Sequence, residues 1–226
     1  MKHQKGADDL KKGQLFSKFS SIIALAARDG ADLSMNAKLR VVVDKAKASG
    51  MTKDAITRAI NRGSGALGGN SIEEIKLEAY GPNGSGILVV CATDNKNRTI
   101  AKVRNTLTKN NLKPADSGSV LWMFEEVGQI EIDKSLFNET LELQFIEMGA
   151  KDIVEEDDLV YIITEAKDLA EVKNLVEKEV KVNDFALVFR HTQGVELSDN
   201  DKEKLNKAID EIEENDDVID VYTNVL

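Results

Sequence analysis

The feature that most constrains the fold of this chain is a change in hydrophobic period near residue 72. Before it, apolar residues recur every three or four positions, as helices that face a core require. The first such stripe comprises Leu15, Phe19, Ile22, Ile23 and Ala26. After residue 72, apolar and polar residues alternate, as in half-buried strands. The sequence therefore predicts an α+β protein with a helical first third.

Three helices are predicted in this first third, over residues 13–29, 36–49 and 52–62. Asn36 and Thr52 are expected to cap the second and third, because short polar side chains accept hydrogen bonds from the first free N–H groups of a helix. Each helix is followed by a glycine that is expected to end it, namely Gly30, Gly50 and Gly63. This pattern predicts a three-helix bundle followed by a Gly- and Ser-rich hinge at residues 63–71.

Two sheet-forming parts follow the hinge. The first reads strand, strand, helix and strand over residues 73–81, 86–93, 98–111 and 117–126. The second falls within residues 128–193 and has the β-α-β-β-α-β order of a ferredoxin-like domain. A last helix and strand, at 198–215 and 217–224, would complete the first part, whose sheet would otherwise leave one face bare. The ferredoxin-like part is therefore expected to be inserted into the other.

The expected domains differ in net charge. These are a helical domain at residues 1–70, a discontinuous α/β domain at 71–128 and 196–226, and an inserted ferredoxin-like domain at 129–195. Residues 1–70 carry 13 Lys and Arg against 6 Asp and Glu, a net charge of +7, within a chain whose net charge is −10. Residues 131–226 carry 10 against 27, a net charge of −17. This asymmetry indicates separate surfaces with separate partners.

Enzyme, metal and membrane signatures are missing from the sequence. His3 and His191 lie far apart without metal-ligand spacing, and Gly63-x-Gly65-x-x-Gly68 follows a helix rather than a strand, so we expect no catalytic residue, metal or cofactor. Cys91 is the only cysteine, so an intrachain disulfide is excluded. The polar start and the short apolar runs predict no secretory signal and no membrane span. A cytoplasmic location is expected.

The candidate nucleic-acid-binding residues of the bundle are cations that recur outside its apolar stripes. They are Lys11, Lys12, Lys18, Arg40, Lys45, Lys53, Arg58 and Arg62. An ordinary solvated surface would look similar, but the net charge of +7 favours contacts with phosphate.

A second candidate is the segment TDNKNRT, residues 93–99, at the start of a predicted helix. Asn97 or Thr99 is the expected cap, and four cations lie at or near the helix start: Lys96, Arg98, Lys102 and Arg104. A first turn normally favours acids, so cations there break a local rule, which often marks a functional site. A capped turn with exposed cations explains the pattern equally well, and both interpretations stay open.

Several segments carry a resemblance to a known family: KGQLFSK, NAKLRVVVDKAKASGMTKDAITRAINRG, YGPNGSGILVVCATDNKNRT, GSVLWMF and DDVIDVYTN. They resemble the YebC/PmpR family, which includes the mitochondrial translational activator of cytochrome c oxidase subunit I. The resemblance implies a helical domain and two α/β domains, with the third inserted in the second. It also implies no catalysis, and action either as a DNA-binding transcriptional regulator or as a translation factor at the ribosome.

The sequence thus predicts a non-enzymatic, nucleic-acid-binding regulator of gene expression. Its partner would be DNA, or ribosomal RNA and the ribosome, bound through the basic first third. The acidic part would face a protein, or would repel nucleic acid from the rest of the chain. The alternatives are a protein-interaction scaffold that uses the acidic domain, and a phosphate- or nucleotide-binding module at residues 93–99.

Overall fold

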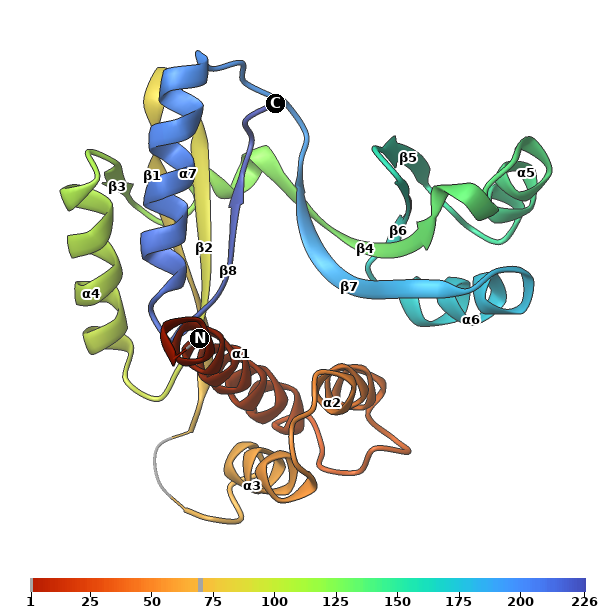
Figure 1. The fold of residues 1–226 in the computed structure, drawn as a ribbon, viewed down its shortest axis with the longest axis horizontal. Coiled ribbons are helices and arrows are strands. Elements are labelled where there is room, and N and C mark those ends of the chain that lie inside the picture. The colour runs from red at the N-terminus through yellow and green to blue at the C-terminus, as the bar shows by residue number, and fades with distance from the viewer. Residues whose placement is uncertain (1, 69–70) are drawn as a thin grey trace. The chain divides into compact units, whose positions relative to one another are not determined.

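The computed structural model describes residues 2–68 and 71–226, with the side chains of 12–36, 38–68 and 71–226. Over these residues the protein is an α+β fold with seven α-helices and two four-stranded antiparallel sheets (Figure 1). The chain forms two compact units. Unit 1 comprises Met1–Trp122 and Gly194–Leu226, and unit 2 comprises Met123–Gln193.

The first three helices of unit 1 form the bundle: α1 (Lys2–Ala27), α2 (Ala37–Ala48) and α3 (Lys53–Gly63). The predicted caps are confirmed, because the Asn36 side chain accepts from the N–H of Leu39 and the Thr52 side chain from that of Ala55. The core between the helices is closed by buried apolar side chains, among them Ile23, Leu39, Val43 and Ile56. Leu15, predicted on the apolar stripe, is instead exposed.

Gly63 ends α3 as predicted, and it also has a role that the sequence did not indicate. It is the last residue of α3, and a Cβ built on it would lie 2.0 Å from the carbonyl oxygen of Ala24 in α1. The glycine therefore allows the two helix backbones to touch. The expectation of a stop is also met at Gly30 and Gly50, which have positive φ angles of 137° and 86°.

The sheet of unit 1 has the strand order β3-β1-β2-β8. Its strands are β1 (Glu73–Tyr80), β2 (Gly86–Thr93), β3 (Lys113–Ala115) and β8 (Val218–Thr223), and a 3₁₀ turn, η1 (Pro82–Gly84), joins β1 to β2. Two helices, α4 (Lys96–Lys109) and α7 (Asp199–Glu213), share a core with the sheet. Every residue of β2 is buried. The closing helix and strand therefore complete this sheet, as predicted.

The strand predicted at residues 117–126 is wrong over residues 117–123, and only its last three residues lie in a strand, the first one of unit 2. The third strand is the short β3, and the chain then forms a turn and a 3₁₀ helix, η2 (Leu121–Met123). The cause is Glu78 of β1, whose buried carboxylate accepts hydrogen bonds from the backbone N–H groups of Gly118, Val120 and Leu121. Amides that bond to a carboxylate are not available to a strand partner.

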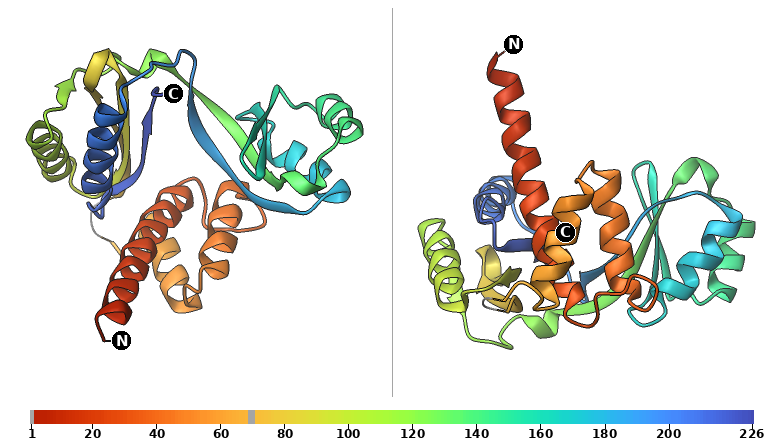
Figure 2. Two further views of the ribbon diagram at one scale, coloured as in Figure 1. Left: turned by 45° about the horizontal axis from the view of Figure 1, so that its top comes forward. Right: turned by 90° about the horizontal axis from the view of Figure 1, so that it is seen from below.

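Unit 2 has the predicted ferredoxin-like fold (Figure 2). Its elements are β4 (Phe124–Asp133), η3 (Lys134–Leu136), α5 (Glu139–Glu147), β5 (Asp152–Glu156), β6 (Leu159–Glu165), α6 (Leu169–Glu179) and β7 (Val182–His191). The strand order is β5-β6-β4-β7, and α5 and α6 share a core with the sheet around the buried Phe145. The domain boundary expected at residues 128 and 129 falls inside β4. The division of the whole chain into three domains stays a prediction.

Candidate nucleic-acid interface

The segment TDNKNRT begins α4 differently from the prediction. The cap is Asn95, whose side chain accepts from the N–H of Arg98 at 3.1 Å, and not Asn97 or Thr99. Thr99 is buried instead. Its hydroxyl donates to Oδ2 of Asp217, 2.6 Å away, and lies 2.8 Å from Oγ1 of Thr93. The helix start is thus fixed to the residue before β8, which is distant in the sequence.

Carboxylates surround the cations at the start of α4. Arg98 contacts Asp94 at 3.2 Å and Asp217 at 3.1 Å. Hydrogen bonding to Asp217, and then the charge of Asp217, raise the pKa of Arg98. Lys96 pairs with Glu73 of β1 at 3.2 Å. The cations in the first turn of α4, which are unfavourable at a helix start, are therefore offset by carboxylates from outside the helix.

We expect Thr99→Val to lower the free energy of unfolding by about 1–2 kcal/mol, because a buried hydroxyl that bridges α4 to Asp217 is lost without a change of shape. Thr108→Val is the matched control, since the Thr108 hydroxyl is exposed and bonds to the carbonyl of Arg104 within the same helix. Urea denaturation of both variants measures the difference. Equal stability of the two would contradict the proposed bridge.

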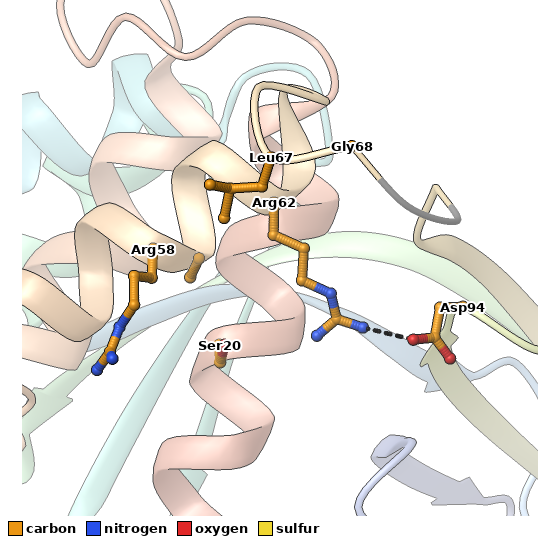
Figure 3. A pocket seen from close by; sticks show the side chains of 7 residues that line it. Ser20, Arg58, Arg62, Leu67, Gly68 and Asp94 are labelled. Carbon is orange, nitrogen blue, oxygen red and sulfur yellow. Dashed lines mark hydrogen bonds and ion pairs between the residues drawn. The ribbon is translucent and has the colours of Figure 1, made fainter.

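A hollow opens beside this segment, between α1, α3 and the chain after α3 (Figure 3). It has a volume of about 380 Å³. Its lining consists of Ser20, Arg58, Ala59, Arg62, Leu67, Gly68 and Asp94. Arg62 points across the hollow and pairs with Asp94 at 3.1 Å, so one carboxylate joins the bundle to the start of α4.

Arg58 lies one helical turn before Arg62, and its guanidinium is exposed at the rim of the hollow (Figure 3). Among the described residues, no carboxylate pairs with it. The hollow therefore offers one arginine held by an acid, one available arginine and the hydroxyl of Ser20.

The other predicted cations do not form one cluster with this hollow. Lys12 lies over the ring of Phe16 at 5.6 Å, and Arg40 donates to the carbonyl of Leu33. Lys18 and Lys45 lie near Asp220 of β8, where their charges oppose the burial that raises the pKa of that carboxyl. Lys53 on α3 and Lys102 and Arg104 on α4 are exposed, and they do not line the hollow. The side chain of Lys11 is outside the described residues.

Four residues that shape this region were not predicted from the sequence: Ser20, Leu67, Asp94 and Asp217. Asp94 could have been predicted from its neighbours, since an acid directly before a helix cap can pair with cations in the first turn of that helix. Asp217 had none, because it is separated from Arg98 by more than half of the chain.

Over the part of the chain that is described, no group of three His, Cys, Asp or Glu side chains could hold a metal ion. None of the helices described is long and apolar enough to cross a membrane.

Cys91 lies fully buried in β2. Burial, and to a lesser extent the charge of Asp217, raise the pKa of its thiol from 9.0 to about 12. The unfolded chain therefore loses this proton at a lower pH than the folded chain, so stability should fall as pH rises above about 9. We expect urea denaturation from about pH 8 to about pH 10 to show an extra loss of stability that Cys91→Ala lacks. An identical pH slope in the variant would contradict the raised pKa.

Comparison with known proteins identifies the family. The model of the TACO1/YebC protein N-terminal domain matches residues 1–66, and that of the TACO1/YebC second and third domain matches residues 72–225. The chain belongs to the TACO1/YebC family. The resemblance noted in the sequence is therefore confirmed.

Bacterial relatives resemble the chain over its full length. A probable transcriptional regulatory protein of Thermoanaerobacter pseudethanolicus is 42% identical over 229 residues, which cover 100% of this chain and 93% of the relative. One from Nitratiruptor is 41% identical, with 100% and 96% covered. The crystal structure of the conserved hypothetical protein Aq1575 from Aquifex aeolicus matches with a TM-score of 0.87 at 34% identity, over 96% of this chain and 90% of that one.

Proposed function

We propose that this TACO1/YebC protein is a non-enzymatic regulator of gene expression that binds the phosphate backbone of nucleic acid through its bundle. The observation that carries the proposal is the exposed Arg58, which has no carboxylate partner among the described residues and lies on a hollow beside Arg62. The names of the relatives, probable transcriptional regulatory proteins, support a role in regulation. The cytoplasm is the proposed site of action.

The hollow is the proposed seat of one backbone phosphate. Guanidinium groups bind phosphate oxygens through charge-assisted hydrogen bonds, and Asp94, which also lines the hollow, holds Arg62 in place. The surrounding bundle has a net charge of +7 over residues 1–70, which supplies attraction that does not depend on base sequence. The acidic unit 2, with 18 Asp and Glu against 7 Lys and Arg, would keep the rest of the chain away from the nucleic acid.

Fluorescence anisotropy tests this proposal with the full chain and two labelled probes, a DNA duplex and a structured RNA hairpin of the same length. We expect binding whose logarithmic affinity falls linearly with the logarithm of salt concentration and changes little with base sequence. The probe that the protein binds with higher affinity identifies the class of nucleic acid. Absence of binding to both probes at low salt would overturn the proposal.

A further inference from the structure

The outer face of α5 in unit 2 is apolar and exposed. Leu143 and Ile146 lie one turn apart on this helix and are 66% and 53% exposed, and Leu136 in η3, just before the helix, is 42% exposed. These are the exposed large apolar side chains of unit 2 among the described residues. Apolar side chains gathered in so short a segment indicate a surface that binds a partner.

The opposite face of α5 already has a partner. Phe145 is fully buried in the core of unit 2, and Leu141 and Met148 pack against that core. The helix is therefore apolar on two sides, and only one side packs within unit 2. The side of a helix that faces solvent normally carries charged and polar residues.

Acidic residues surround the exposed apolar face. Glu139, Glu142 and Glu147 lie on α5, all are exposed, and the helix contains no basic residue. None of the three pairs with a cation among the described residues. Unit 2 as a whole carries 18 acidic and 7 basic residues, a net charge of −11.

The glutamates around the exposed apolar side chains indicate which kind of partner can bind the outer face of α5. Nucleic acid and anionic lipid would meet unpaired glutamates of like charge. Two copies that pair through the same face would also bring these glutamates together, because a two-fold interface places the same surface patch on both sides. A basic partner would pair with the glutamates and cover the apolar side chains.

We propose that the outer face of α5 docks a basic segment of a partner protein, one that presents apolar side chains to Leu143 and Ile146 and Lys or Arg to the surrounding glutamates. The apolar contacts would supply the anchor, and the charges would set orientation and partner choice. Unit 2 would thus recruit a protein, whatever unit 1 binds.

Site-specific photocrosslinking in cells tests this surface in the full chain. Leu143→p-benzoylphenylalanine places the probe on α5, and Glu171→p-benzoylphenylalanine places it at an exposed control position on α6 of the same unit. We expect the α5 probe, and not the control, to crosslink to a protein whose crosslinked peptide has a net positive charge and apolar residues. Mass spectrometry identifies that peptide.

Reversing the charge of the glutamates on α5 is the second test of this proposal. In the probe-bearing chain, Glu139→Lys with Glu142→Lys should abolish the crosslink, whereas Glu171→Lys with Glu177→Lys on α6 should keep it. Crosslinks only to nucleic acid, to a second copy or within the same chain would overturn the proposal, as would an acidic partner peptide or equal yields at both positions. Because the bundle is unchanged in all variants, these outcomes are independent of nucleic-acid binding.

Discussion

Glu78→Ala is expected to lower the free energy of unfolding of unit 1 by about 3–5 kcal/mol. Glu78 is only 4% exposed. Its Oε1 accepts from the N–H of Gly118 at 2.7 Å, and its Oε2 accepts from those of Val120 at 2.6 Å and Leu121 at 3.0 Å. Alanine would leave these three donors unsatisfied at a site that holds the chain after β3.

Urea denaturation gives the loss of stability, and hydrogen exchange at Gly118 and Val120 shows whether the damage begins in this turn. Glu74→Ala is the matched control on the same strand, because its exposed carboxylate pairs with the side chain of Lys76, at 3.5 Å, and with no other cation among the residues described. We expect the control to change stability by less than about 0.5 kcal/mol. A Glu78→Ala protein as stable as the control would show that the buried carboxylate does not hold the turn.

Reversal of Lys53 and Arg58 together is expected to weaken nucleic-acid binding about 10- to 100-fold at low salt and to lower the salt slope by about 2. Neither side chain has a carboxylate partner among the described residues, so reversal breaks no ion pair described there. Lys53 is also the first residue of α3, where a glutamate would favour the helix dipole. The expected loss therefore concerns binding rather than folding.

Lys178→Glu with Lys181→Glu is the matched control, since it changes the net charge equally at exposed positions of unit 2. Anisotropy titrations against DNA and RNA at several salt concentrations compare the two double variants. Equal losses in both would mean that net charge alone, and not the surface of α3, governs binding. Reversal of Arg62, Lys96 or Arg98 is a poorer test, because each of these pairs with a carboxylate that helps to hold the fold.

Much of the fold could be predicted because its signals are local. Asn36 and Thr52 cap their helices from the adjacent position, so a short segment of sequence suffices to find them. The ferredoxin-like order and its insertion followed from successive hydrophobic patterns and from the bare sheet face that the closing helix had to cover.

The errors came from contacts between distant residues. The apolar run from Val120 to Phe124 is typical of a strand, but Glu78, about forty residues earlier, binds the backbone at Val120. Asn97 and Asn95 are chemically equal caps, and the buried bond between Thr99 and Asp217 is part of what distinguishes them. The contact between Gly63 and α1 was also not predicted, since nothing in the local sequence shows it.

The candidate site was predicted less well than the fold, for the same reason. Composition identified the basic first third, but it could not show that Arg62 and Arg98 share Asp94 while Arg58 stays available. The segment TDNKNRT joins α4 to its surroundings and contributes Asp94 to the hollow, whereas its two cations, Lys96 and Arg98, pair with carboxylates.

The proposed function requires that the bundle binds nucleic acid in the cell. Ultraviolet crosslinking of the tagged full chain, followed by sequencing of the attached DNA and RNA, tests this binding, with the Lys53→Glu, Arg58→Glu protein alongside. We predict enrichment over a mock purification, and a clear loss in the variant. Reads on ribosomal RNA would identify a translation factor, and reads at promoters a transcriptional regulator. No enrichment, or equal recovery with the variant, would contradict the proposed function.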